Sequence, residues 1–448
     1  MKLLKTFVLA MTMTTMIGSA VLANQCKLDV STPKPVLKAD QKQTTFIKVG
    51  VTGFEMKSEK ERTPLNIAIV LDRSGSMSGE KIRQAKEAAI CAVEQLTADD
   101  IVSVVVYSSD VEVLVPATKL TDRETILKKI NSIEASGSTA LYDGTKTGSK
   151  EVEKFFDKNR VNRVVLLSDG LANVGPSSVS ELQELGQEIG SKGISVTTFG
   201  LGEGFNEDLM TQLAAASDGN HIFITKSSNL IDVFKEEFQF AAAVVAQEVA
   251  CKLVLDEGIR PIRVLNMDAD IQGQNVEFQW NQIYSGLERY MILEIEVPSG
   301  KKGESKKLGT AFLTYANMET NATDELSATA SVRFSDSEAL IEESINKETL
   351  ELCVIQVANL ENQRATELRD QGQIEQAQAV LNSNVSYIRG MGAMMGGSYE
   401  EKLESIASRN SIQAEELSSD SNWKESRKKM RAYQNFDSMQ APSSVPVR

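Results

Sequence analysis

The sequence predicts a doubly wound, Rossmann-like α/β domain that is inserted into a β-sandwich and followed by a C-terminal helical region. Three observations support this prediction. Buried strands alternate with amphipathic helices over residues 63–245, a pattern typical of a parallel sheet covered by helices. Short strands occur on both sides of this segment, and helical periodicity begins near residue 337. Because the two ends of a domain often lie close together, one domain can be inserted into another.

The composition is that of an ordinary globular protein. The chain has 448 residues, of which 41% are hydrophobic and 25% are charged. Its 48 Lys and Arg residues against 62 Asp and Glu residues give a net charge of −14, which argues against nucleic acid as a partner. His221 is the single histidine, so a zinc site built from two histidines is excluded.

Residues 1–23 have the features of a secretory signal peptide. Lys2 and Lys5 precede an apolar stretch, and Val21-Leu22-Ala23 offers a cleavage site. The mature chain would begin near Asn24, or after Ala20. No later stretch approaches the roughly 18 apolar residues that a membrane-spanning helix needs. We therefore expect an exported protein, periplasmic or secreted to the cell exterior, with no membrane-spanning segment in the mature chain.

The α/β domain is predicted to begin with a strand over residues 65–71, a nearly continuous apolar run of the kind that is buried on both faces. A helix follows, with Ile82, Ala85, Ala89, Val93 and Leu96 on one face. The alternation continues with strands at 101–107, 111–115, 161–167, 194–201 and 221–225. Further helices are predicted at 123–133, 141–156, 179–190, 207–216 and 230–245.

The sandwich is predicted to be discontinuous, with residues 24–62 joined to 246–336. In residues 288–297, Met291, Leu293, Ile295 and Val297 alternate with polar residues, as in a strand with one buried face. Residues 337–434 are predicted to form a helical hairpin, with Gly372 between its helices and a flexible Gly- and Met-rich break at 390–397. Residues 435–448 are predicted to form a flexible tail.

Three polar segments follow strands or precede helices at one edge of the predicted sheet. Asp72-Arg-Ser74-Gly-Ser76 follows the first buried strand, Ser136-Gly-Ser-Thr139 precedes a helix, and Leu166-Leu-Ser-Asp169-Gly170 ends another strand. Parallel α/β sheets bind ligands at the carboxyl ends of their strands. The three segments together therefore indicate a binding site.

These motifs resemble the von Willebrand factor type A (VWA) domain with a complete metal-ion-dependent adhesion site, over about 180 residues. The family pattern of D-x-S-x-S, a threonine and an aspartate corresponds to Asp72, Ser74, Ser76, Thr139 and Asp169. The resemblance implies that Mg²⁺, or Mn²⁺ or Ca²⁺, is held by the hydroxyl groups directly and by the aspartates largely through water. Mg²⁺ prefers oxygen ligands and keeps waters readily.

The resemblance further implies a non-enzymatic protein-binding module, in which the metal docks an acidic side chain of a partner. The alternative is a vestigial site that binds metal but no partner, or neither. The serines have no adjacent base, so no catalytic residue is predicted. Residues 282–298 resemble the β region of bacterial envelope VWA proteins labelled calcium-activated chloride channel homologues, and the layout loosely resembles inter-alpha-trypsin inhibitor heavy chains. A competing hypothesis is an assembly subunit of an envelope complex that acts through its helical region.

The four cysteines fall into two groups. Cys91 and Cys353 lie in predicted helices and are expected to be free thiols. Cys26 and Cys251 each open a predicted strand and are each followed by Lys-Leu. Because exported proteins meet an oxidising compartment, a Cys26–Cys251 disulfide across the base of the inserted domain is a possible pairing.

Overall fold

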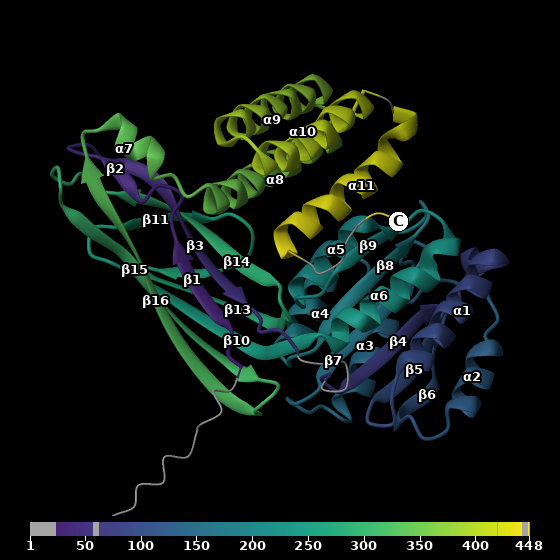
Figure 1. The fold of residues 1–448 in the computed structure, drawn as a ribbon. Coiled ribbons are helices and arrows are strands. Elements are labelled where there is room, and N and C mark those ends of the chain that lie inside the picture. The colour runs from purple at the N-terminus through teal and green to yellow at the C-terminus, as the bar shows by residue number, and fades with distance from the viewer. Residues whose placement is uncertain (1–23, 57–61, 419, 441–446, 448) are drawn as a thin grey trace, which may run out of the picture.

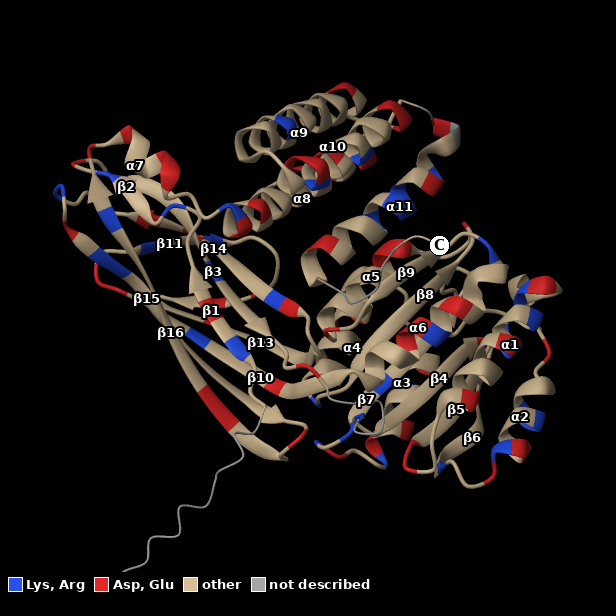
Figure 2. Cartoon of the chain, in the orientation of Figure 1, with Lys and Arg blue, Asp and Glu red and all other residues tan. Residues whose placement is uncertain are grey.

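The computed structural model describes residues 24–56, 62–418, 420–440 and 447. The predicted signal peptide, residues 1–23, lies outside the described residues. The chain forms an α/β domain, a β-sandwich and a helical region, which lie against one another (Figure 1). Basic and acidic residues are interspersed along the elements of all three parts (Figure 2). In the described residues, no helix is long and apolar enough to cross a membrane.

The α/β domain is built on a six-stranded sheet, which confirms the predicted fold class. The strand order is β6-β5-β4-β7-β8-β9, and every pairing is parallel except that of the edge strand β6. The four central strands are buried at every residue because helices cover both faces. The strands are β4 (Leu65–Asp72), β5 (Ile101–Tyr107), β6 (Val111–Lys119), β7 (Val161–Ser168), β8 (Ser195–Leu201) and β9 (His221–Ile224).

Helices α1, α2 and α6 contribute buried residues to one apolar core of this sheet, and α3, α4 and α5 contribute to the other. Local caps fix several helix starts: Ser178 and Glu181 form a capping box at α4, and Asn206 caps α5. The helices are α1 (Glu80–Gln95), α2 (Arg123–Asn131), α3 (Leu141–Glu153), α4 (Val179–Gly190), α5 (Glu207–Ala216) and α6 (Leu230–Ala242). Two 3₁₀ turns, η2 (Gly75–Met77) and η3 (Ser227–Asn229), complete the domain.

The sandwich combines strands from before and after the α/β domain. One sheet has the order β1-β3-β14-β11 and the other β12-β13-β10-β15-β16-β2. Strand β3 pairs with β14 over their whole lengths, from Thr52↔Glu288 to Gln43↔Val297, so the chain leaves and re-enters the sandwich around the inserted domain. The strands are β1 (Lys27–Ser31), β2 (Val36–Lys38), β3 (Gln43–Thr52), β10 (Val244–Leu255), β11 (Arg260–Val264), β12 (Asp270–Gln272), β13 (Asn275–Tyr284), β14 (Glu288–Val297), β15 (Ser305–Asn317) and β16 (Ala322–Ser335).

The helical region contains several helices rather than the predicted single hairpin. They are α7 (Glu338–Glu343), α8 (Lys347–Asp370), α9 (Ile374–Met395), α10 (Ser398–Glu416) and α11 (Asp420–Met439). The predicted flexible break at 390–397 is wrong, because α9 continues through it to the buried Met395. Helix α9 packs on α10 here, and Met395 belongs to one apolar cluster with Leu403 and Ala407 of α10. Gly396 and Gly397, both with positive φ, make the turn.

The predicted flexible tail also begins too early. Helix α11 runs past residue 435 to Met439, and Gln440 then bonds to the backbone of Tyr290 in the sandwich. Asn435 is buried. The helix is stabilised by contacts with distant parts of the chain, which local sequence patterns do not report.

The structure does not contain the Cys26–Cys251 disulfide, because both residues are buried free thiols. The prediction assumed that both cysteines open strands at matching positions. Cys251 instead lies in the middle of β10, opposite Phe278 and Leu313 of the neighbouring strands. Cys26 precedes β1 of the opposite sheet, and its N–H donates to the Tyr315 hydroxyl at 2.9 Å.

A buried polar network joins the α/β domain to the sandwich. Arg163 of β7 has a side chain that is only 2% exposed. It donates to Glu237 of α6 at 2.6 Å, to the Tyr284 hydroxyl of β13 at 2.8 Å, and to the Gln282 amide oxygen. Thr197 of β8 also donates to Glu237, at 2.7 Å. The Arg163 guanidinium and the Glu237 carboxylate thus neutralise each other's charge at the buried interface.

We expect Arg163→Met to lower the free energy of unfolding by about 3–5 kcal/mol, because it leaves the Glu237 carboxylate buried without its cation. Urea denaturation followed by circular dichroism measures this change. Arg260→Met is the matched control, because Arg260 pairs with Glu296 on the exposed surface and surface pairs contribute little. Equal stability of the two variants would show that the buried Arg163–Glu237 pair contributes no more than a surface pair.

We expect no 26–251 crosslinked peptide in unreduced protein. Burial raises the pKa of the Cys26 thiol to about 11 and that of Cys251 to about 12. Because the thiolate is the reactive form, iodoacetamide at about pH 8 should leave both residues unmodified in the folded protein. It should modify both after denaturation without reductant, as judged by peptide mass spectrometry. Recovery of a crosslinked peptide would restore the predicted disulfide.

Candidate functional site

The structure brings the five predicted site residues to the carboxyl edge of the parallel sheet. Asp72 is the last residue of β4, Ser74 and Ser76 lie at the start of and within η2, and Asp169 follows β7 directly. Thr139 precedes α3. All except Ser76 are buried, and Ser76 is exposed. The site therefore opens to solvent at Ser76.

Hydrogen bonds connect the oxygen atoms of the site. The Ser74 and Ser76 hydroxyl oxygens are 3.0 Å apart, and the Ser76 hydroxyl donates to Asp169 Oδ1 at 2.6 Å. A Cβ placed on Gly170 would lie 3.3 Å from both the Ser76 and the Thr139 hydroxyl oxygens. Glycine at this position thus leaves space between two hydroxyl groups that face the same point.

Residues that the sequence analysis did not select hold the site in place. Asp72 accepts from the Ser74 N–H at 2.8 Å and from the Ser168 hydroxyl at 2.7 Å. The Thr139 N–H donates to the Asn173 side chain at 2.8 Å. Ser168 precedes Asp169 in the sequence, so its position at the strand end was the signal that could have identified it. Only the folded loop brings Asn173 next to Thr139.

Two electrostatic features distinguish the aspartates. Burial raises the pKa of the Asp72 carboxyl group, although hydrogen bonds from Ser74 and Ser168 oppose that effect. Asp169 instead forms an ion pair between its Oδ2 atom and the ammonium group of Lys81 in α1. Lys81 lies outside the five-residue motif.

The donor set fits a hard divalent cation. Three hydroxyl oxygens and two carboxylates supply only oxygen ligands, which Mg²⁺ prefers. In the part of the chain that the structure describes, no group of three or more His, Cys, Asp or Glu side chains could hold a metal. A metal at this edge would therefore depend on the serine and threonine hydroxyls.

The single histidine lies in the core of the α/β domain rather than at the candidate site. His221 is buried in β9, where its Nδ1 atom lies 2.8 Å from the Thr198 hydroxyl. Burial lowers the pKa of His221 to about 4. The histidine is thus a strand residue in the domain core, as expected, and it forms no hydrogen bond to the site serines.

The von Willebrand factor type A domain model matches residues 66–237, which contain the sheet and all five site residues. Residues 66–237 are a VWA domain. Such domains are typically protein-interaction modules, generally non-enzymatic and often extracellular, and they commonly bind a divalent metal at the adhesion site. The match covers the α/β domain and leaves the sandwich and the helical region outside it.

Three curated relatives share this domain. The uncharacterized protein sll0103 of Synechocystis is 26% identical over 59% of this chain and 65% of its own length. Escherichia coli YfbK is 28% identical over 47% of this chain and 37% of its own. Human inter-alpha-trypsin inhibitor heavy chain H3 is 33% identical over 35% of this chain and 18% of its own. The chain thus matches less than two thirds of each relative's length.

Two solved structures share the fold beyond the VWA domain. A von Willebrand factor type A protein from Catenulispora acidiphila aligns with a TM-score of 0.68 over 86% of this chain and 89% of its own, at 16% identity. The ArnB paralog VWA2 from Sulfolobus acidocaldarius aligns with a TM-score of 0.59 over 92% of this chain and 99% of its own, at 15% identity. At these identities the likeness concerns the fold alone.

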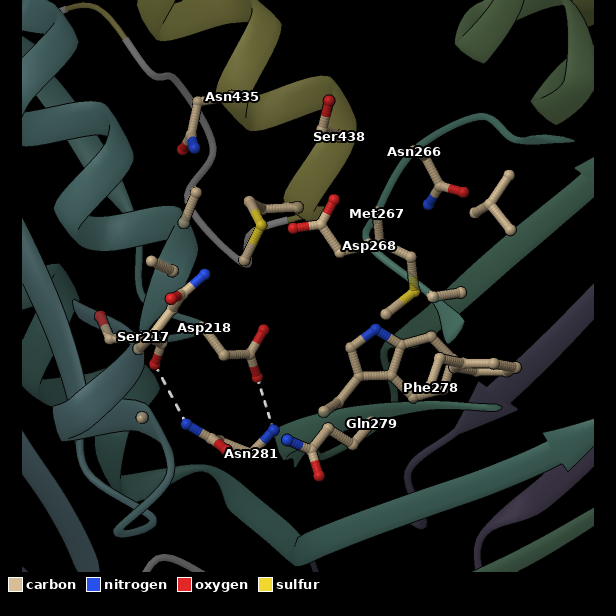
Figure 3. A pocket seen from close by; sticks show the side chains of 18 of the residues that line it. Ser217, Asp218, Asn266, Met267, Asp268, Phe278, Gln279, Asn281, Asn435 and Ser438 are labelled. Carbon is tan, nitrogen blue, oxygen red and sulfur yellow. Dashed lines mark hydrogen bonds between the residues drawn. The ribbon is translucent and has the colours of Figure 1, made fainter. Parts of the chain in front are cut away.

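A groove of about 1480 Å³ lies where the VWA domain, the sandwich and the helical region meet. Figure 3 shows Asn281 next to Ser217 and Asp218, to which dashed lines join it, with Asn435 and Ser438 on another side of the groove. Asp218 accepts two hydrogen bonds from Arg289, at 2.7 and 2.8 Å, and one from the Asn281 N–H at 2.6 Å. None of the five candidate ligands lines this groove, so it is separate from the candidate metal site.

Proposed function

We propose that the VWA domain binds a divalent cation, Mg²⁺ in the first place, and docks a carboxylate of a protein partner through it. The observation that carries this proposal is the convergence of Asp72, Ser74, Ser76, Thr139 and Asp169 at one sheet edge, with Ser76 open to solvent. The role is non-enzymatic binding by an exported protein. Its location in the periplasm or at the cell exterior rests on the pattern of residues 1–23.

The neutral ligands matter to this chemistry. The hydroxyls of Ser74, Ser76 and Thr139 would contact the ion, while Asp72 and Asp169 would act largely through water. Because few charged groups would contact the ion, the ion would remain electrophilic. It would then be a Lewis acid that a partner's carboxylate can bind. A preformed oxygen set of this kind costs little to organise on binding.

The rim of the site adds an apolar contact. Leu171, two residues after Asp169, is 58% exposed. A solvent-exposed leucine beside an ion site suits a partner whose acidic residue is flanked by an apolar one, since burial of both contributes to binding.

A second candidate function, assembly through the helical region, is supported by apolar residues on its surface. Met394 of α9 and Ile412 of α10 are 51% and 58% exposed. In this case the helical region, rather than the metal, would make the essential contact with an envelope complex.

We expect Asp72→Ala combined with Ser74→Ala to abolish Mn²⁺ or Mg²⁺ binding measured by calorimetry, with the fold intact by circular dichroism. The variant removes one direct ligand and one carboxylate. Ser78→Ala is the matched control, because Ser78 lies on the same turn but bonds only to the Gly75 carbonyl. Unchanged metal affinity in the double variant would refute the site assignment.

We expect capture of the partner from envelope extract to be lost when EDTA removes the metal, and also with the Asp72→Ala/Ser74→Ala variant. The comparison is a pulldown with the full mature chain, followed by mass spectrometry. Capture that survives EDTA but is lost when residues 337–448 are deleted would favour assembly through the helical region instead.

A further inference from the structure

Lys81 is a charged residue of the adhesion site that the VWA motif does not include. It is the second residue of α1, and its ammonium group contacts Asp169 Oδ2. The Lys81 side chain is 37% exposed, whereas that of Asp169 is 0% exposed. The lysine thus reaches from the surface to a fully buried carboxylate of the candidate metal site.

The position of Lys81 opposes a local preference of the helix. The amino end of a helix carries partial positive charge, so acidic residues are favoured in its first turn and cations are disfavoured. Glu80 is the acidic residue of that turn, and it accepts hydrogen bonds from the side chains of Arg83 and Gln84. Lys81 pairs with Asp169 instead of with Glu80. Residues that break a local rule are expected at functional sites.

Both oxygens of Asp169 are occupied by groups of this chain. Oδ1 accepts from the Ser76 hydroxyl at 2.6 Å, and Oδ2 contacts Lys81. A buried carboxylate needs a partner charge or hydrogen bonds to offset its desolvation, and Lys81 provides that charge without a metal. A divalent cation at the same site would meet the ammonium charge as a repulsion.

We infer that Lys81 is a resident counter-cation of the adhesion site, which neutralises Asp169 in the metal-free protein and weakens the binding of a divalent cation. This inference rests on the proposed metal site. It makes Lys81 a positioning residue: it holds Asp169 through their ion pair and sets the metal affinity without itself being a ligand.

The test compares the Mn²⁺ affinity of the full mature chain with that of Lys81→Met, by calorimetry at low and high salt. We expect Lys81→Met to bind Mn²⁺ about tenfold more tightly because the repulsion is gone, and to show a smaller difference at high salt. The metal-free variant should melt at a lower temperature than the wild type, and Mn²⁺ should raise its Tm by more. A purely structural role would not strengthen metal binding.

Three further variants make the result specific. Lys81→Arg keeps the charge and should keep the wild-type affinity. Lys81→Gln loses the charge but can still donate a hydrogen bond to Asp169. It should also bind Mn²⁺ more tightly than the wild type, and it provides the test if Lys81→Met folds poorly. Lys128→Met is the matched control, because Lys128 pairs with Glu124 on the exposed face of α2, outside the site.

The outcomes separate this inference from the proposed function. If the wild type binds Mn²⁺ and the uncharged variants bind equally or more weakly, the role of Lys81 is refuted and the metal site stands. If Mn²⁺ binds to the uncharged variants but not to the wild type, the counter-cation role is supported. If neither wild type nor variants bind, the proposed metal site is wrong and the inference fails with it.

Discussion

The ion pair between Arg163 and Glu237 is the constraint on which the arrangement of the molecule depends. Arg163 lies near the start of β7 and joins α6 of the VWA domain to β13 of the sandwich. Asp169 directly follows the other end of the same strand. A fully hydrogen-bonded strand is stiff, so the interface with the sandwich and the candidate metal site share one rigid element.

A second set of charges ties the helical region to the same edge of the VWA sheet. Lys428 of α11 is buried, where it bonds to the Phe205 carbonyl and pairs with Glu207. The loop that carries Phe205 passes close to the site, since a Cβ on Gly204 would lie 2.3 Å from the Asp169 carbonyl oxygen. The C-terminal helix therefore supports the segment beside Asp169 and gives the third part of the chain a physical connection to the site.

The site itself combines buried carboxylates with neutral hydroxyls, and this combination explains its electrostatics. Two buried acids without a metal would be costly, so each is compensated locally. Asp72 accepts hydrogen bonds from Ser74 and Ser168. Asp169 accepts a hydrogen bond from Ser76 and forms an ion pair with Lys81. These contacts hold the oxygen atoms in place. The proposed cation would compete with them, so its affinity would depend on all the residues at this edge of the sheet.

Strand–helix alternation and the order of the strands in the sequence predict the α/β fold and the convergence of the five site residues. Short apolar runs such as residues 65–71, followed by an amphipathic helix, indicate buried strands. The carboxyl ends of neighbouring parallel strands lie at one edge of the sheet. The alternating pattern of residues 288–297 likewise identified a sandwich strand. These features could be predicted because they depend on periodicity and on chain order, which are local properties.

Contacts between segments far apart in sequence could not be predicted in this way, because they form only in the folded chain. The Lys81–Asp169 pair, the packing of α11 on the VWA domain and the free thiols of Cys26 and Cys251 depend on which surfaces face each other. The predicted break at 390–397 failed for the same reason, because packing of α9 on α10 keeps the helix continuous as far as Met395. Side-chain pairing across 88 residues, as for Lys81 and Asp169, leaves no periodic trace in the sequence, since its free energy comes from burial and charge in the folded protein.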